Sequence, residues 1–429
     1  MTILLPIAAL FALFIVGMPI GFTLGIAGVF GIYLAGGLDA MKGLLTLTPY
    51  EISASFLFSA VPMFVLMAEF VARGGLAKDL FNLAYKWFGH LPGGLAVATV
   101  VASAGMGAMT GASTASAAAM AAVCMPEMDR YHYKRFFSAA TVAAGGTLAI
   151  MIPPSIPMLV YGVQTETSIG QLFIAGIIPG IMIAVVYSAG ISTWVLMRPD
   201  LSLRVKPFSF RERFEAFKYV WPVVLLVVLV IGGMYVGLVT PTEAGALGSA
   251  GALGITLVMR RITWQDILQA LYSTAVTTAM LMTIVIGAHF FVYYLTMAGV
   301  SNAVAQLLRT VPLPPVATLI LFIVPIYIIL GLFMDNIPIL LLTLPVTFPA
   351  AIHLGFDPIW FGILVVALGE LGLITPPVGL TAFVVSAVAN VPLDEVFKGL
   401  FPFMILDLAV LALLIFFPEI ATFLPGLMR

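Results

Sequence analysis

The sequence is poor in charge, in cysteine and in histidine. Only 9% of its 429 residues are charged, whereas 62% are hydrophobic. A soluble protein usually carries about 25% charged residues, so the composition excludes a water-soluble fold and places the chain in a lipid bilayer. The single cysteine, Cys124, excludes an internal disulfide and a thiolate metal site. Four histidines and a net charge of -1 argue against a histidine metal cluster and a nucleic-acid partner.

Apolar stretches long enough to cross a bilayer recur from one end of the chain to the other. We predict ten full membrane spans, the first a retained span rather than a signal peptide, at 1–17, 19–38, 52–75, 136–163, 170–197, 219–239, 243–259, 268–298, 358–389 and 397–426. Two further apolar blocks, 92–126 and 312–350, are predicted to be re-entrant helical hairpins. Folding the first block at Gly111 leaves about 17 residues per arm, which is short for a full crossing.

The basic residues predict the orientation of these spans. If the N-terminus lies outside, 15 of the 18 Lys and Arg residues fall on one side, and only Lys42, Arg309 and Arg429 fall on the other. The basic side of a membrane protein faces the cytoplasm, so we expect a bacterial inner-membrane protein with both termini in the periplasm. The charged stretch 201–218 is predicted to be a cytoplasmic interfacial helix; a plain cytoplasmic loop is the alternative.

Helix-breaking residues recur at a nearly constant spacing, which indicates an internal repeat. The matched residues, 219 to 223 positions apart, are Pro92 and Pro312, Gly111 and Gly331, Pro126 and Pro345, Gly146 and Gly369, Pro153-Pro154 and Pro376-Pro377, Gly176 and Gly399, and Pro179 and Pro402. Two halves follow, 1–200 and 219–429, each with five spans and one hairpin. Because five is odd, the second half enters the membrane the other way up. The predicted fold is therefore an all-α polytopic membrane protein with two inverted repeats.

The chemistry is predicted where helices are interrupted at membrane depth: at the hairpin tips 109–116 and 331–336, and at the two proline pairs. Interrupted backbone inside a bilayer is tolerated where protein or a cavity covers it. Freed carbonyls suit a hard cation such as sodium, whereas helix N-termini suit a carboxylate. We assign to sodium Ser103, Gly111, Ser113, Thr114, Gly146, Thr147, Gly331, Asp335, Asn336, Gly369, Gly372 and Thr375. We assign to the substrate Thr110, Ser116, Pro153, Ser155, Pro376 and Pro377. For each hydroxyl the alternative is a hydrogen bond to its own helix or close helix packing.

Acidic residues within spans are costly and are therefore functional candidates. Asp335 at the second tip is predicted to be a cation ligand or its close electrostatic partner. Glu370 lies in the second break, where either its carboxylate or the neighbouring glycine carbonyls face the site. Glu243 starts a helix and can serve as a cap. For Glu69 and Asp407 a functional role and a structural one, a bond across helices or to a partner subunit, are both open.

Several motifs at these positions resemble one transporter family. They are Gly-Ala-Ser-Thr-Ala-Ser-Ala-Ala-Ala at 111–119, Met-Pro-Glu-Met at 125–128, Ile-Pro-Pro-Ser-Ile-Pro at 152–157, Thr-Pro-Thr-Glu-Ala-Gly at 240–245 and Gly-Leu-Ile-Thr-Pro-Pro-Val-Gly at 372–379. Together they look like the large membrane subunit of tripartite ATP-independent periplasmic (TRAP) transporters. The resemblance implies an elevator-type fold, a small four-helix membrane subunit and a periplasmic substrate-binding protein. It also implies sodium-coupled import of sialic acid or a C4-dicarboxylate, with no organic cofactor.

Three other functions are weighed against this one. A one-component sodium- or proton-coupled organic-anion carrier would have the same core motifs without a binding protein. An intramembrane enzyme is disfavoured, because the chain has no His-Glu-x-x-His motif and no paired Gly-x-Gly-Asp aspartates. A channel is disfavoured by the matched breaks with hydroxyls. We therefore predict a transporter rather than an enzyme.

Overall fold

The computed structural model describes residues 4–203, 207–300, 303–304, 306 and 312–428. Within these residues every regular element is a helix, and eight helices are long and apolar enough to cross a membrane. The prediction of an all-α polytopic membrane protein is thereby confirmed. Arg309 and Arg429, two of the three basic residues predicted opposite the others, lie outside the described residues.

The helices of the first half are α1 (Leu4–Ile15), α2 (Ile20–Ser53), the 3-10 helix η1 (Phe56–Ser59), α3 (Ala60–Arg73), α4 (Leu76–Phe88), α5 (Gly94–Thr110), α6 (Ser113–Arg130), α7 (Arg135–Met151), α8 (Ile156–Thr165), α9 (Ile169–Met197) and the 3-10 helix η2 (Pro199–Leu201). Those of the second half are α10 (Phe210–Val227), the π-helix η3 (Val228–Gly232), α11 (Gly233–Tyr235), α12 (Pro241–Val258), α13 (Trp264–Met297), α15 (Pro315–Thr318), the π-helix η4 (Leu319–Ile323), α16 (Val324–Gly331), α17 (Asn336–His353), α18 (Pro358–Ile374), α19 (Leu380–Ala389), α20 (Leu393–Phe416), α21 (Glu419–Thr422) and the 3-10 helix η5 (Pro425–Leu427).

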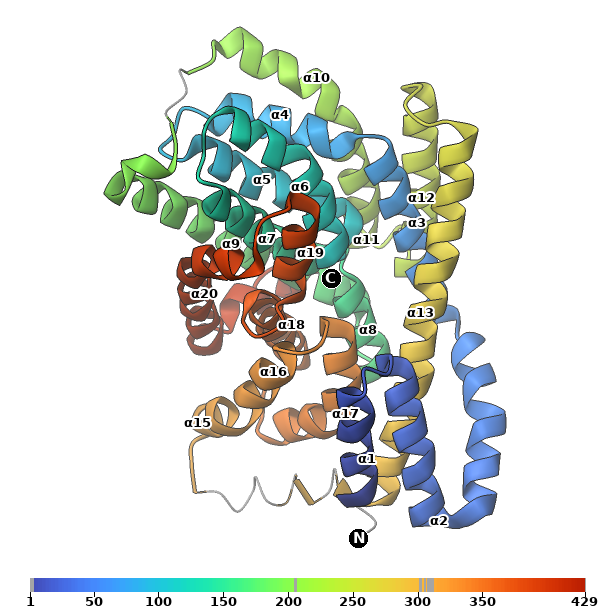
Figure 1. Cartoon of the computed structure of the whole chain (residues 1–429). Coiled ribbons are helices and arrows are strands. Elements are labelled where there is room, and N and C mark those ends of the chain that lie inside the picture. The colour runs from blue at the N-terminus through green and yellow to red at the C-terminus, as the bar shows by residue number, and fades with distance from the viewer. Residues whose placement is uncertain (1–3, 204–206, 301–302, 305, 307–311, 429) are drawn as a thin grey trace.

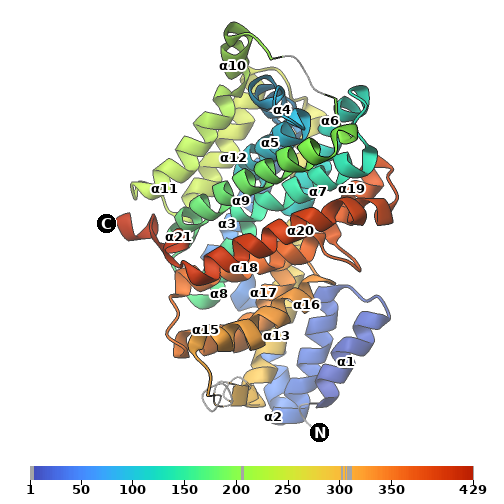
Figure 2. The ribbon, with the colours of Figure 1, turned by 90° about the vertical axis from the view of Figure 1, so that its left-hand side faces the viewer.

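The helices form two groups with different shapes. In one group α3, α12 and the long α13 stand side by side, and α2 packs along α13 (Figure 1). In the other group the helices α5 to α9 and α16 to α20 pack around one another, and α9, α18 and α20 lie beside each other (Figure 2). Residues of α7 and α18 are almost all buried, as expected for helices surrounded by protein rather than lipid. The interrupted helices therefore occupy the interior of the second group.

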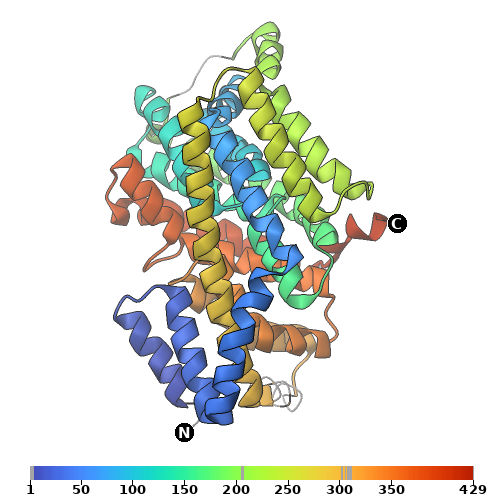
Figure 3. The same ribbon diagram turned by 90° about the vertical axis from the view of Figure 1, so that its right-hand side faces the viewer.

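Helix α2 departs from the predicted spans. Its backbone is non-helical at Gly37, where φ is 79°, a conformation that glycine adopts at little cost. The chain reverses direction there and then rises beside α13 as far as α3 (Figure 3). Residues 39–51, which the prediction left between two spans, are thus helical, and they extend the span predicted at 52–75.

Three further boundaries differ from the prediction. The helix expected at 201–218 begins at Phe210, where Ser209 and Glu212 form a capping box, and α10 continues without an end at residue 218. Residues 76–88, assigned to no element, form the amphipathic helix α4, which packs on α5 and α10. The last predicted span, 397–426, ends at Phe416, before Pro418, and a separate short helix follows.

Charged side chains connect α3 and α4 to α13 and the turn before it. Arg73 Nη1 donates to Gln269 Oε1 over 2.8 Å, and Arg73 Nε donates to Glu69 Oε2 over 3.1 Å. Arg261 forms an ion pair with Asp79. Glu69, whose structural alternative is a bond across helices or to a partner, instead pairs with an arginine of its own helix, and that arginine makes the contact to α13.

The contact between α2 and α13 depends on glycine, because helices without bulky side chains approach closely in membranes. A Cβ at Gly28 would overlap the backbone of Phe291, and one at Gly21 would lie 2.9 Å from the Thr283 carbonyl carbon. At Gly43, by contrast, a Cβ would meet nothing within 4 Å.

We therefore predict that Gly28→Ala destabilises the purified protein. Overpacking at such a contact costs about 1–3 kcal/mol, so the melting temperature in detergent should fall. The control Gly43→Ala should leave it unchanged or raise it, since alanine stabilises a helix interior relative to glycine by about 0.5–1 kcal/mol. Equal melting temperatures for the two variants would contradict the close-packing account.

Candidate functional site

The first hairpin tip lies directly against the first helix break. Helix α5 ends at Gly111, which has a left-handed backbone with φ of 62°, and α6 begins two residues later. The Gly111 carbonyl accepts a hydrogen bond from Ile156 N over 3.2 Å. A Cβ at Gly111 would lie 2.5 Å from the Pro154 carbonyl oxygen. The tip and the break thus satisfy part of each other's backbone.

The break itself separates α7 from α8 at Pro153-Pro154, a cis peptide bond. Ser155 occupies the N-cap of α8: its hydroxyl accepts from Met158 N over 3.4 Å and donates to Ile150 O over 2.6 Å. Because Gly111 contacts the Pro154 carbonyl and Ile156 N, the segment with Ser155 and the two prolines lies next to the tip.

The second tip also packs on the interrupted helix of its half, but it meets α18 before the break and uses different side chains. Helix α16 ends at Gly331, whose Cα would lie 2.5 Å from a Cβ at Gly372 of α18. Asp335 caps α17 by accepting from Asn336 N over 2.7 Å. The Asn336 amide is fully buried over Gly369, and its Nδ2 donates to Val366 O over 3.0 Å. Helix α18 ends before Pro376-Pro377, the second cis bond.

Three buried oxygens near these contacts lack a hydrogen-bond partner: Ser103 Oγ, Ser116 Oγ and Asn336 Oδ1. Ser103 lies against Gly145 of α7, since a Cβ at Gly145 would be 2.9 Å from its hydroxyl. A buried polar atom without a partner is costly, and a hydroxyl or amide oxygen suits a hard cation. The donor set on both sides therefore fits sodium.

Other predicted hydroxyls bond to the preceding turn of their own helix. Thr110 donates to Met106 O over 3.1 Å, and Thr375 donates to Leu371 O over 2.6 Å. Ser113 is buried at the start of α6, and Thr114 beside it is half-buried. For Thr110 and Thr375, the alternative of a hydrogen bond to their own helix is therefore the one observed.

Asp335 faces a cavity between the second tip and the α2–α13 pair. The cavity has a volume of about 510 Å³, and Asp335 is its one charged lining residue. The rest of the lining comes from apolar side chains and Thr283 of α13. A carboxylate in such surroundings attracts a cation rather than an anionic substrate. Asp335 therefore lies where the second hairpin meets helices α2 and α13.

A buried polar cluster joins α7, α9, α18 and α20. Thr147 Oγ1 lies 2.8 Å from Glu370 Oε1, and Tyr187 donates to Asp407 Oδ1 over 2.6 Å. Glu370 thus turns toward the first half of the chain, and Asp407 bonds across helices, which is its structural alternative. The sequence gives no signal for Tyr187, because nothing in its local pattern reveals the carboxylate that it meets. Glu243 forms a capping box with Thr240, so its carboxylate serves helix α12.

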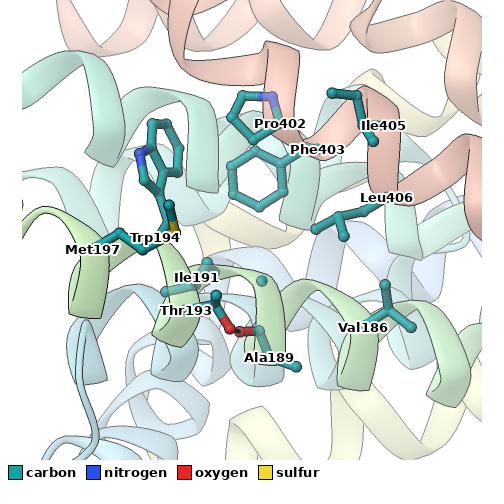
Figure 4. Close-up of a pocket in the computed structure, with 11 residues that line it drawn as sticks. Val186, Ala189, Ile191, Thr193, Trp194, Met197, Pro402, Phe403, Ile405 and Leu406 are labelled. Carbon is teal, nitrogen blue, oxygen red and sulfur yellow. Dashed lines mark hydrogen bonds between the residues drawn. The ribbon is translucent and has the colours of Figure 1, made fainter.

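A second cavity, between α9 and α20, does not suit a carboxylate. It measures about 540 Å³, and the side chains of Trp194, Phe403 and Leu406 line it (Figure 4). The one hydroxyl among its lining residues, Thr193, donates to Ala189 O over 2.8 Å. No lining residue is charged, so this cavity offers an anion no counter-charge.

The comparisons with known proteins agree with this architecture. Residues 7–420 match the family described as the tripartite ATP-independent periplasmic transporter, DctM component. The chain is 36% identical to the C4-dicarboxylate TRAP transporter large permease protein DctM of Pseudomonas aeruginosa, covering 94% of each chain. It is 33% identical to the 2,3-diketo-L-gulonate TRAP transporter large permease protein YiaN of Escherichia coli, covering 98% of each.

A solved structure shares the fold at low sequence identity. The YdaH transporter of Alcanivorax borkumensis aligns with a TM-score of 0.60 and 14% identity over 89% of each chain. The family match spans nearly all of the sequence, including both tips and both breaks. The chain therefore belongs to the DctM family, the large permease component of tripartite ATP-independent periplasmic transporters.

Proposed function

We propose that this permease imports a small carboxylate by sodium symport, with sialic acid or a C4-dicarboxylate as the substrate. The observation that supports it best is that each hairpin tip packs on the interrupted helix of its own half, beside buried oxygens that have no partner: the first tip on the break itself, the second on Gly369 and Gly372 of α18. Two such sites, one in each half, offer hard oxygen ligands to cations. The N-terminus of α19, which follows the second break and has no side-chain cap, offers N–H groups to a carboxylate. At α8 the N–H groups of Ile156 and Met158 are already bonded, to Gly111 O and Ser155 Oγ.

The proposed cycle follows from the two helix groups. The hairpins and broken helices form a unit that moves, and α2, α3, α12 and α13 form the scaffold. Sodium binds first at the tips and orders them, which completes the carboxylate site between them. The loaded unit, with its charge largely neutralised, then crosses the membrane, because an uncompensated charge in the bilayer is costly.

The proposal includes two partners and one location. A small four-helix membrane subunit covers part of the scaffold, which exposes large apolar side chains, among them Phe22, Phe30 and Tyr33 of α2. A periplasmic substrate-binding protein delivers the carboxylate. The chain lies in the bacterial inner membrane with both ends in the periplasm. In this orientation the basic residues Arg73 and Arg261 lie on the cytoplasmic side.

Uptake into proteoliposomes tests the whole proposal. Sodium-driven accumulation of a C4-dicarboxylate or of sialic acid should require the permease, the small subunit and the matching binding protein together. Accumulation by the permease alone would favour the one-component carrier. Equal uptake with and without a sodium gradient would contradict the symport.

We predict that Asp335→Asn weakens sodium coupling while leaving the helix cap intact, because asparagine also caps helices. Losing a hydrogen bond or contact to a charged group costs about 1.5–3 kcal/mol. The sodium concentration for half-maximal uptake should therefore rise about tenfold to a hundredfold. The exposed Asp39→Asn is the matched control. A wild-type sodium dependence in Asp335→Asn would remove Asp335 from the site.

We also predict that Gly111→Ala impairs uptake without preventing membrane insertion. A left-handed backbone costs a residue with a Cβ about 1–2 kcal/mol, and the added carbon would press on the Pro154 carbonyl. The tip would therefore separate from the break. Gly170→Ala, where a Cβ meets nothing within 4 Å, should transport normally. Normal transport by both variants would show that the tip–break contact is dispensable.

A further inference from the structure

The strongest unexplained feature is the hydrogen bond between Thr147 and Glu370. Thr147 follows Gly146 in α7, and Glu370 follows Gly369 in α18. The two residues are 223 positions apart, the same separation as the two glycines and as Pro153 and Pro376. They are thus equivalent residues of the two halves, and they touch each other. Equivalent residues in contact lie where the two halves meet.

From this contact we infer that Thr147 and Glu370 act as positioning residues that couple the two proposed sodium sites, so that the ions bind cooperatively. The inference rests on the proposed sodium symport. It replaces the sodium-ligand role that the sequence predicts for Thr147, because the hydroxyl lies against Ala144 O and Glu370 Oε1; both residues connect the sites and neither binds an ion.

The residues next to Thr147 and Glu370 each pack against one hairpin. On the first side, Gly146 lies against Ala117 of α6: a Cβ at Gly146 would lie 2.5 Å from the Ala117 Cβ. On the second side, the buried Asn336 side chain of α17 lies directly over Gly369. A change in either hairpin therefore reaches α7 or α18 at the residue next to the hydrogen bond.

The interior around the bond transmits such a change rather than absorbing it. Thr147 is 0% exposed and Glu370 is 1% exposed. Helices α7 and α18 contact each other, and each also contacts its hairpin. Protein interiors are packed as densely as organic crystals, so displacements pass between neighbours. A 2.8 Å bond between two buried groups is the polar part of that contact.

The Thr147 hydroxyl and the Glu370 carboxylate differ in how much each depends on the hydrogen bond between them. Thr147 Oγ1 lies 2.8 Å from Ala144 O as well, so the hydroxyl has a partner within its own helix and does not need Glu370 to avoid a buried, unpaired donor. Glu370 has no such alternative: its Oε2 has no partner, and the nearby Asp407 carboxylate is occupied by Tyr187. The orientation of Glu370 therefore depends on Thr147.

Each hairpin tip has two states: in contact with its interrupted helix, or separated from it. The hydrogen bond would shift the equilibrium between these two states. When the first site binds sodium and its tip seats, α7 is held in place, and through Thr147 and Glu370 α18 is held with it. The second site then needs less ordering to bind its ion. By thermodynamic reciprocity, the second site assists the first to the same extent.

The test measures sodium binding directly, by the rise in melting temperature of the purified permease as sodium is added without substrate. Wild type should show a sigmoidal dependence on sodium. Thr147→Val removes the hydroxyl at nearly constant volume and should lower the Hill coefficient to about 1. Thr147→Ser, which keeps the hydroxyl, should restore the wild-type curve.

The matched control is Thr141→Val. Thr141 is also fully buried in α7 and donates to Phe137 O over 2.8 Å, and no bond joins it to the second half. This variant should keep the sigmoidal curve whatever its effect on the melting temperature itself. Glu370→Gln, which can still accept from Thr147, should retain part of the cooperativity. It provides a second variant should Thr147→Val fail to fold.

The outcomes separate this inference from the proposed function. A sigmoidal curve that Thr147→Val leaves unchanged, or a hyperbolic curve in wild type, would overturn the coupling while leaving sodium binding in place. A wild-type melting temperature that does not respond to sodium, with choline as the ionic-strength control, would overturn the symport and the coupling together.

Discussion

Main-chain groups at membrane depth need partners, and this requirement governs the arrangement of the whole chain. Within a bilayer no water is available to the N–H and C=O groups that a broken helix exposes. Here Pro153 and Pro154 at the first break are buried, whereas Pro376 and Pro377 at the second are exposed. At the first break, part of the backbone is satisfied by the neighbouring hairpin tip, because the Gly111 carbonyl accepts from Ile156 N. The first hairpin is therefore needed to cover its break.

The two halves solve the same problem with different chemistry. The first tip is closed by backbone contacts and carries small hydroxyl residues, whereas the second is closed by the Asn336 amide and capped by a carboxylate. A neutral site and a site with one formal charge differ in how strongly they attract a cation. On this basis the second half is the stronger electrostatic partner for sodium in the proposed cycle. The Thr147–Glu370 contact would then let the stronger site prepare the weaker one.

Substrate identity is the least constrained property of the chain. Relatives of similar identity are named for a C4-dicarboxylate and for 2,3-diketo-L-gulonate. Both names denote small carboxylates. Neither of the two cavities described above supplies a second strong clue, because one has no charged lining residue and the other carries only the Asp335 charge.

The amino-acid sequence alone determined the solvent, the helix class and the places where helices stop. These properties follow from local chemistry: apolar runs require lipid, proline lacks an N–H, and glycine permits the left-handed backbone found at Gly111. The sequence did not determine the reversal at Gly37 or the placement of helix α4, since each depends on which neighbour a helix packs against. The start of α10 at Phe210 does have a local signal, the capping box of Ser209 and Glu212, which the prediction missed. Nor could it pair Tyr187 with Asp407 or Thr147 with Glu370. Those partners lie more than 200 residues apart, and only the tertiary packing of α7, α9, α18 and α20 brings their side chains within hydrogen-bond distance.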